Sequence, residues 1–279
     1  MSQTLSDRLD RAADLLRDCE SVVVGFSGGV DSALVARLAV DVLGTNRVLA
    51  VTGLSAAVPE VQRRAARTFA AEQGIPHLEV ETRELERERY VRNEGDRCYH
   101  CKSVLWPALR EVARGRGLRT LVDGANADDL WDYRPGGRAG TEHGVRSPLA
   151  QAGIDKAGVR TASRRLGLST WDAPAAPCLA SRLAYGVSVT ADRLGQVERA
   201  EDGLRALGFV EVRVRHHGDC ARVELAPAEL ATAGARAHAI AGALRRAGFA
   251  RVLLDVEGYR RGALNESLPL VELRRGRVA

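Results

Sequence analysis

Strand patterns recur along the first half of the chain, in mainly apolar runs at residues 22–26, 48–52 and 120–123 and in an alternating stretch at 78–81. Helical spacing of apolar residues separates these runs, over 6–18, 33–42, 60–72 and 104–114. Ser6 is a candidate N-cap for the first of these helices. Strands that alternate with helices are typical of a parallel sheet with helices on both faces, so the pattern predicts an α/β fold.

The order of the expected elements changes after residue 186. A helix over 191–207 is followed by strand patterns within 209–218 and 220–226, a long helix over 227–247 and a closing strand within 250–257. This order predicts a smaller α+β unit, so we expect a first domain over 1–186 and a C-terminal domain over 187–279. The stretch 124–190 is rich in Gly, Asp and Arg and regains helical spacing only over 153–168. Long connections of this kind are often functional.

The first strand pattern runs into the sequence Ser-Gly-Gly-Val-Asp-Ser at residues 27–32. Gly28 and Gly29 allow a sharp turn and a close backbone approach, and the following helix start offers unpaired N–H groups to an anion. Ser27 and Ser32 add hydroxyl donors, whereas Asp31 would repel a phosphate unless a cation such as Mg²⁺ lies between them. The spacing matches neither the Walker loop nor the dinucleotide fingerprint. A glycine turn without function is the alternative.

This loop, in its strand–loop–helix setting, resembles the PP-loop of the ATP pyrophosphatases. In that superfamily the loop holds pyrophosphate, and ATP is cleaved between its α and β phosphates. The resemblance implies ATP as a cofactor, and the position of Asp31 beside the phosphates makes it the expected ligand of a Mg²⁺ ion. It also implies a second nucleotide loop after the next strand, where residues 51–57 contain Ser55. Adenylation gives a carboxylate a good leaving group. We therefore expect an enzyme that activates a carboxylate, amide or carbonyl oxygen.

Composition narrows the classes of partner. The net charge is +5, but the 41 basic residues include only two lysines, Lys102 and Lys156, and the arginines form no block interleaved with aromatic residues. Arginine usage spread over the whole chain explains this charge, so we expect no nucleic-acid partner. No apolar run reaches the roughly 20 residues of a membrane span, and the charged N-terminus is unlike a secretory signal. We expect a cytoplasmic protein without a membrane partner.

The chain has five cysteines, an odd number that disfavours a disulfide framework where no export signal is found. Cys98 and Cys101 form a Cys-x-x-Cys pair, and Cys178 stands alone among Ala and Pro. Half of a zinc site, a redox pair and buried inert thiols are the open alternatives for these three. We expect Cys19 to be buried at a helix end and Cys220 to lie in a strand, both without a role.

Further motifs follow one another along the chain: "SGGVDS", "DRCYHCK", "DGANADDLWDYRPG", "GVRSPL", "CLASRLAYG", "VRVRHHG" and "EGYRRGALNE". In this order they resemble the ATP-dependent sacrificial sulfur transferase family known as LarE, over nearly the whole chain. That family acts in synthesis of the nickel-pincer nucleotide, the cofactor of lactate racemase. The resemblance implies that the carboxylates of pyridinium-3,5-dicarboxylic acid mononucleotide are adenylated and converted to thiocarboxylates. It also implies a homo-oligomer.

The resemblance allows two sulfur sources. In one type of member a single cysteine gives up its sulfur and becomes dehydroalanine, and Cys178 matches that residue. In the other type three cysteines hold a 4Fe–4S cluster, and the additional pair matches Cys98 and Cys101. Three thiolates leave one iron of the cubane open for hydrosulfide, so we favour the cluster and keep donation from Cys178 as the alternative. The sequence identifies no donor that reloads the sulfide.

The matched motifs also supply candidates for the substrate phosphate, namely Ser181, Arg182, Arg213, Arg215 and Arg260. A solvated strand face is the alternative for Arg213 and Arg215. We expect Gly124 and Asn126 to line the nucleotide pocket. Asp128 and Asp129 could bind Mg²⁺ or hold their own loop, and we favour the loop. The chain departs from the family pattern at Ala173, where a lysine is more frequent, and at Trp131, where a small residue is usual.

Other functions compete with this interpretation. A tRNA thiolase of the same superfamily also combines a PP-loop with three cysteines, but no RNA-binding appendage is recognisable. An amidotransferase-type ligase needs an ammonia source, and the chain contains no glutaminase domain. A module in which ATP only switches conformation would have little use for Asp31 beside the phosphate loop.

Overall fold

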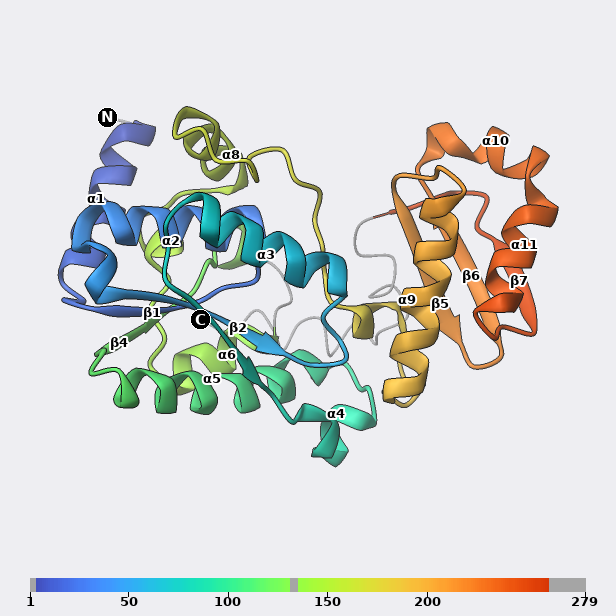
Figure 1. The fold of residues 1–279 in the computed structure, drawn as a ribbon, viewed down its shortest axis with the longest axis horizontal. Helices are drawn as coiled ribbons and strands as arrows, with labels where there is room; N and C mark the ends of the chain where they lie inside the picture. The colour runs from blue at the N-terminus through green and yellow to red at the C-terminus, as the bar shows by residue number, and fades with distance from the viewer. Residues whose placement is uncertain (1–3, 131–134, 261–279) are drawn as a thin grey trace.

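A four-stranded parallel sheet organises the first part of the computed structural model, which describes residues 4–130 and 135–260 (Figure 1). Its strands are β1 (Val22–Gly25), β2 (Val48–Leu54), β3 (His77–Glu81) and β4 (Thr120–Val122). The order across the sheet is β3-β2-β1-β4, and every neighbouring pair is parallel. The α/β fold with a parallel sheet is therefore confirmed.

Helices cover both faces of this sheet (Figure 1). One face packs against α1 (Leu5–Arg17), α2 (Val30–Leu43), α3 (Glu60–Glu72) and α8 (Lys156–Arg165), and the other against α5 (Arg97–Gly115) and α6 (Pro135–Glu142). In β1, Val22 and Val24 pack into the hydrophobic cluster on the side of α1, α2, α3 and α8, while Val23 packs into the cluster on the side of α5 and α6. Side chains alternate between the faces of a strand, so a strand buried on both sides reads as an unbroken apolar run.

A three-stranded sheet forms the second lobe (Figure 1). It has the order β5-β6-β7, in which β5 (Val212–His217) and β6 (Cys220–Leu225) are antiparallel and β7 (Arg251–Leu254) runs parallel to β6. Its helices are α9 (Ala191–Ala206), α10 (Leu230–Ala235) and α11 (Ala237–Arg246). The hydrophobic cluster under this sheet also takes in Leu179, Ala180 and Leu183 from the segment before α9. The predicted domain boundary near residue 187 stays a prediction.

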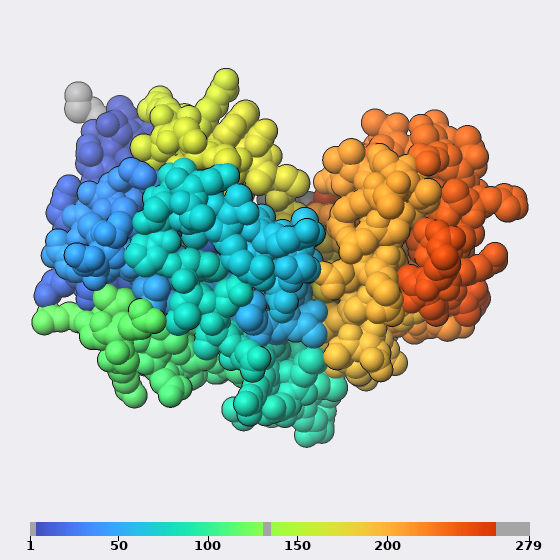
Figure 2. Space-filling model, viewed as in Figure 1, coloured from blue at the N-terminus to red at the C-terminus, as the bar shows by residue number. Residues whose placement is uncertain are grey.

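The two lobes touch along one side (Figure 2). At this junction the backbone N–H of Glu60, the first residue of α3, donates to Glu198 Oε1 of α9 at 2.8 Å. The short elements that complete the described fold are α4 (Glu88–Val91), α7 (Pro148–Gln151) and the 3₁₀ segments Thr45–Arg47, Glu84–Glu86, Ala127–Leu130, Leu179–Arg182 and Pro227–Glu229. Within the described ranges, no helix is long and apolar enough to cross a membrane.

Some predicted boundaries are wrong for local reasons. The N-cap of α1 is Thr4, not Ser6, because Thr4 and Asp7 form a reciprocal capping box. The helix expected over 104–114 starts at Arg97, so Cys98 lies in its first turn and Cys101 at the beginning of its second. The long helix expected over 227–247 is broken at Arg236, whose guanidinium donates to Leu207 O and lies over the Phe209 ring.

Candidate functional site

The predicted nucleotide-binding residues gather at the carboxyl ends of the first sheet. Residues 27–32 follow β1, Ser55 follows β2, and Gly124 and Asn126 follow β4. The chain passes from β1 through β2 to β3 on one side and returns to place β4 on the other side of β1. Ligands of open α/β sheets bind at such a switch point, outside the carboxyl ends of the strands.

The loop between β1 and α2 is tied together by its own two serines. Ser32 is 5% exposed, and its hydroxyl accepts the Ser27 N–H at 3.2 Å and donates to Gly29 O at 3.1 Å. The Ser27 hydroxyl lies 3.2 Å from that of Ser32 and accepts the Gly29 N–H at 3.3 Å. Gly28 has φ +74°, and a Cβ there would lie 2.9 Å from Ala66 Cβ of α3. The loop is therefore a tight turn that directs the start of α2 outward.

The first turn of α2 has groups that could bind an anion. Gly29 is its N-cap, and no side chain caps the helix. The N–H groups of a first turn have no partner within their helix and carry the positive end of its dipole. A Cβ on Gly124 would lie 2.6 Å from the Ser32 nitrogen, so the end of β4 is pressed against this turn. Glycine is required at 124 for that approach.

Asp31 in this turn is held from two directions. Asn126 Nδ2 donates to Asp31 Oδ1 at 3.1 Å, and the Lys156 ammonium pairs with Asp31 Oδ2. Asp129 accepts the Asn126 N–H at 3.1 Å, and Asp128 accepts the Lys156 N–H at 3.0 Å. Asp129 therefore holds its own loop as expected, whereas the Asp128 side chain holds the start of α8. Lys156 was missed as a site residue, although its rarity in an arginine-rich chain was a usable signal.

A single carboxylate suits the Mg²⁺ of a nucleotide site, because this ion binds one or two carboxylates together with substrate phosphates. Asp31 is 24% exposed beside the phosphate-binding turn and fits that role. Across the described residues, no group of three or more His, Cys, Asp or Glu side chains is placed to hold a metal ion. A Mg²⁺ site made by protein side chains alone is therefore not found in that part of the chain.

The segment that carries Cys178 contacts the second nucleotide loop. Cys178 is the N-cap of the 3₁₀ segment Leu179–Arg182, and the Leu179 N–H donates to Ala57 O at 2.7 Å. The Ala57 N–H in turn donates to the Ser55 hydroxyl at 3.1 Å. Cys178 therefore lies one residue from a direct bond to the loop that follows β2.

The structure also brings the Cys-x-x-Cys pair toward Cys178. Cys101 and Cys178 pack against the same hydrophobic cluster, which contains the buried Tyr90. Cys98 is exposed, and Cys101 and Cys178 are half-buried. Three positions apart in a helix, Cys98 and Cys101 lie on one side of α5.

A buried polar link fixes this arrangement. Asn93 is fully buried at φ +56°, and its Nδ2 donates at 2.8 Å to both Ala184 O and Val187 O, beyond Cys178. Its Oδ1 accepts a hydrogen bond from Arg97. Arg97 is 5% exposed and directly precedes Cys98. Asn93 and Arg97 thus tie the start of α5 to the segment that follows Cys178.

Burial, then Cys178 and Glu84, raise the pKa of Cys101 to about 12, although Lys102 acts in the opposite direction. Three thiolates are the donor type and number that would leave one iron of a 4Fe–4S cluster open. The three thiols do not form a ready metal-binding group.

The arginines predicted at the substrate phosphate are largely engaged by protein groups. Arg182 is 3% exposed and bonds Glu201, Pro177 O and Cys178 O. Burial alone would raise the pKa of Glu201, but Arg182 and Arg205 hold it below its ordinary value. This buried cluster fixes the backbone on both sides of Cys178.

Arg213 and Arg215 are buried, so the solvated strand face is wrong for both. Arg215 pairs with Glu224 at 2.8 Å and donates to Ser181 O at 2.9 Å. Arg213 donates to Ala175 O at 2.8 Å and lies over the Tyr259 ring, but its buried Nε has no partner among the described residues. Burial and then Arg182 lower the pKa of Arg213.

The remaining positions singled out in the sequence give no further support to a phosphate site. The Ser181 hydroxyl donates to Cys178 O at 2.7 Å, and Arg260 pairs with Glu257 at 2.8 Å. Ala173 O accepts from Arg160 at 2.9 Å, and Trp131 lies outside the described residues. The expected positions of Cys19 and Cys220 are confirmed, since both are buried, one just after α1 and one at the start of β6. That neither has a role stays a prediction.

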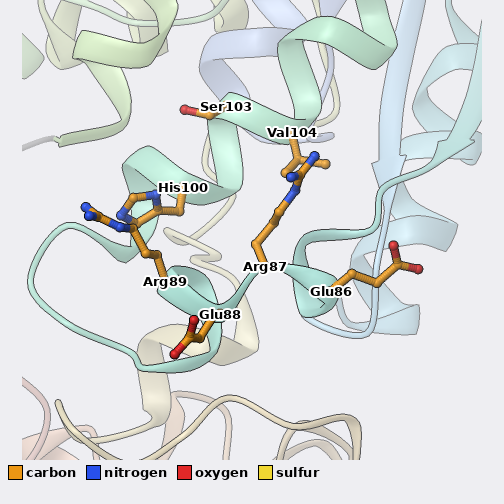
Figure 3. Close-up of a pocket in the computed structure, with 7 residues that line it drawn as sticks. All are labelled: Glu86, Arg87, Glu88, Arg89, His100, Ser103 and Val104. Carbon is orange, nitrogen blue, oxygen red and sulfur yellow. The ribbon is translucent and has the colours of Figure 1, made fainter.

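A hollow of about 500 Å³ between α4 and α5 takes in none of the predicted site residues (Figure 3). In it, Arg89 lies beside His100 and Arg87 reaches toward Val104 (Figure 3). His100 is already hydrogen-bonded to Asp96 at 3.0 Å. On α5 the hollow is lined by His100, Ser103 and Val104, which lie on a different side of the helix from Cys98.

Known proteins resemble this chain in part and over nearly its whole length. A family model described as NAD synthase matches residues 7–97. The pyridinium-3,5-bisthiocarboxylic acid mononucleotide synthase of Lactiplantibacillus plantarum is 36% identical over 270 residues, which cover 97% of this chain and 98% of that protein. An uncharacterised protein of Synechocystis sp. is 41% identical, with 95% and 99% covered. The NH₃-dependent NAD⁺ synthetase of Methanosarcina mazei is 38% identical over 84 residues, 28% of this chain and 33% of that protein.

Proposed function

Since this chain belongs to the pyridinium-3,5-bisthiocarboxylic acid mononucleotide synthase family, we propose that it is an ATP-dependent, AMP-forming sulfur transferase. Its proposed substrate is pyridinium-3,5-dicarboxylic acid mononucleotide, whose carboxylates it converts to thiocarboxylates for the nickel-pincer nucleotide. The observation that carries the proposal is the hydrogen bond from Leu179 to Ala57, which joins the Cys178 segment to a nucleotide loop. Activation and sulfur transfer need reacting groups held in one place.

The first step is adenylation at the start of α2. The phosphates of ATP bind the N–H groups of that turn and the hydroxyls of Ser27 and Ser32, with Asp31 as the Mg²⁺ ligand. A substrate carboxylate oxygen attacks the α phosphorus, and the bond to the bridging oxygen breaks with release of pyrophosphate. The product is an acyl-adenylate with AMP as its leaving group. Asn126 and Lys156 hold the Asp31 carboxylate in position.

The second step replaces AMP by sulfur. A sulfur nucleophile attacks the acyl carbon, and the electron pair of the broken carbon–oxygen bond leaves with AMP. If Cys178 is the donor, its sulfur keeps the new bond while the bond to Cβ breaks and the Cα proton is lost, which leaves dehydroalanine. If a 4Fe–4S cluster serves instead, Cys98, Cys101 and Cys178 would hold it, and it would supply a bound sulfide.

The substrate phosphate is assigned to the β5 end of the site. Arg213 supports this assignment best, because its buried Nε has no partner among the described residues. An unpaired buried donor is costly unless a ligand satisfies it. Arg215 and Ser181 lie on the same side, joined to each other by a hydrogen bond of 2.9 Å. Arg182 and Arg260 remain in the proposal as further cations, although both have protein partners.

The proposal is tested by mass spectrometry of the product and of the protein after reaction with Mg·ATP and the pyridinium dicarboxylate nucleotide. We expect thiocarboxylate from the wild type and none from Cys178→Ser, while Cys220→Ser, a buried thiol away from the site, keeps the activity. Loss of product in Cys98→Ser would favour the three-cysteine source, and dehydroalanine at 178 would favour sacrifice. Consumption of ATP stimulated by tRNA and not by this nucleotide would contradict the proposal.

A further inference from the structure

The strand β7 leaves one edge of the second sheet uncovered by any described residue. The strand order β5-β6-β7 puts it at the end of the sheet, where it pairs only with β6. Leu253 is 57% exposed and Leu254 is 36% exposed, and Val256 just beyond the strand is 83% exposed. Apolar edge strands are templates for pairing with another strand, and proteins normally blunt or cover them.

The hydrogen-bonding groups of β7 fix which residues face this edge. The N–H groups of Arg251 and Asp255 donate toward β6, to Asp219 O and Val223 O. Backbone direction alternates along a strand, so Val252 and Leu254 point their N–H and C=O groups away from β6. These two residues are the ones available to a further strand.

A second copy of β7 satisfies these groups when it runs antiparallel with Leu253 on the twofold axis. Val252 then lies opposite Leu254 of the partner subunit, and each such pair exchanges two backbone hydrogen bonds. Leu253 meets its own copy at a non-hydrogen-bonded position, where side chains approach most closely. An isologous contact of this kind closes on itself.

The charges of β7 complement each other in the same register. Arg251 lies opposite Asp255 of the partner subunit on the same face as Leu253, and the twofold axis repeats the pair. The Arg251 side chain is 70% exposed, and its only ion-pair partner among the described residues is the exposed Asp219. An exposed pair of this kind contributes little to stability, so Arg251 can also pair with a partner subunit. Asp255 is 3.6 Å from Arg222. A register shifted by two residues would lose these opposite charges.

We propose that the exposed edge of β7 is a dimer interface, at which two copies of this chain join their three-stranded sheets into one continuous sheet. The argument rests on edge groups that no described residue pairs with, on the exposed leucines and on the Arg251–Asp255 complementarity. It is independent of the proposed sulfur transfer, because β7 carries none of the residues assigned to the reaction.

The mass of the full chain in solution, measured by light scattering over a range of concentrations, tests the interface. We expect an even-numbered oligomer whose dimer dissociation constant rises at least about tenfold in Leu253→Glu, since two like charges then face each other on the axis. Val210→Glu is the matched control, because Val210 is also an exposed apolar residue of this lobe (84%) but lies before β5. Its mass should equal that of the wild type.

Two further variants make the register testable. Arg251→Asp and Asp255→Arg should each weaken the dimer, and the double variant should recover it. Leu253→Cys should form an intersubunit disulfide on oxidation that Val210→Cys does not form. A monomeric wild type, an unchanged mass in Leu253→Glu, or equal cross-linking of the two cysteine variants would overturn the proposal.

Discussion

The ammonium of Lys156 forms an ion pair with the carboxylate of Asp31, although the two residues are 125 positions apart. The pair joins the first residue of α8 to the first turn of α2, directly after the loop of residues 27–29. A cation of the protein thus already neutralises the carboxylate that we assign to Mg²⁺. When Mg·ATP binds, Lys156 must share Asp31 with the metal or turn to the phosphates, and in either case its charge favours the nucleotide.

Replacement of Lys156 by Ala should therefore weaken nucleotide binding. We expect KM for ATP to rise about 10- to 100-fold, because a charge-assisted contact is worth about 1.5 to 3 kcal/mol. Lys156→Arg should restore part of the loss. The matched control is Arg37→Ala, which removes a cation of α2 that is paired with Asp41. AMP formation at varied ATP is the measurement, and equal KM values for the two alanine variants would remove Lys156 from the site.

The contact between Gly124 and the first turn of α2 should tolerate no side chain. A Cβ would meet the Ser32 nitrogen at 2.6 Å, so Gly124→Ala must push β4 away from the loop. We expect a loss of about 1 to 3 kcal/mol in the free energy of unfolding together with weaker ATP binding. Gly115→Ala is the control, since nothing lies within 4 Å of a Cβ there. Chemical denaturation and nucleotide titration of both variants check this, and an unaltered Gly124→Ala protein would contradict the packing.

The cysteines of the Cys-x-x-Cys pair should differ in reactivity. Burial raises the pKa of Cys101 from its ordinary value of 9.0 to about 12, while Cys98 is exposed. At pH 8 such a shift leaves about a thousandfold less thiolate, the reactive form. We expect iodoacetamide to label Cys98 long before Cys101 in metal-free protein, as followed by peptide mass spectrometry. Labelling of both at the same rate would mean that Cys101 is not buried as described.

His216 should make the stability depend on pH. Burial, followed by Arg193 and His217, lowers the pKa of His216 from 6.5 to about 4. Between these values the unfolded chain binds a proton that the folded chain does not, so the stability from this residue is present above pH 6.5 and is lost as the pH falls to about 4. Denaturation of the wild type and of His216→Gln should show a shallower pH dependence for the variant in this window. Parallel curves would contradict a neutral buried His216.

The sequence was sufficient for the elements whose pattern is local. Unbroken Val-rich runs predicted β1 and β2 of the parallel sheet, and the amphipathic spacing of α3 gave its bounds, Glu60–Glu72, correctly. The family resemblance drawn from short motifs is confirmed by the full-length similarity to the Lactiplantibacillus plantarum synthase. The loop motif predicted a strand–turn–helix arrangement, because its glycines and serines act on one another within six residues.

The features that were missed depend on contacts between distant segments. Nothing near Lys156 in the sequence indicates Asp31 as its partner. The alternation in β5 is equally compatible with exposed and buried arginines, and only the pairing with Glu224 and the contact with Tyr259 decide that Arg213 and Arg215 are buried. The early start of α5 depends on Arg97, whose partner Asn93 is fixed by carbonyls some 90 residues later.

The most direct test of the central claim measures AMP and pyrophosphate formed from Mg·ATP with and without pyridinium-3,5-dicarboxylic acid mononucleotide. The account predicts that both products appear in equal amounts, that they depend on the nucleotide acceptor, and that Asp31→Asn reduces them strongly while Arg37→Ala does not. Release of ADP and phosphate, or AMP formation that ignores the acceptor, would contradict adenylation of this substrate at the start of α2.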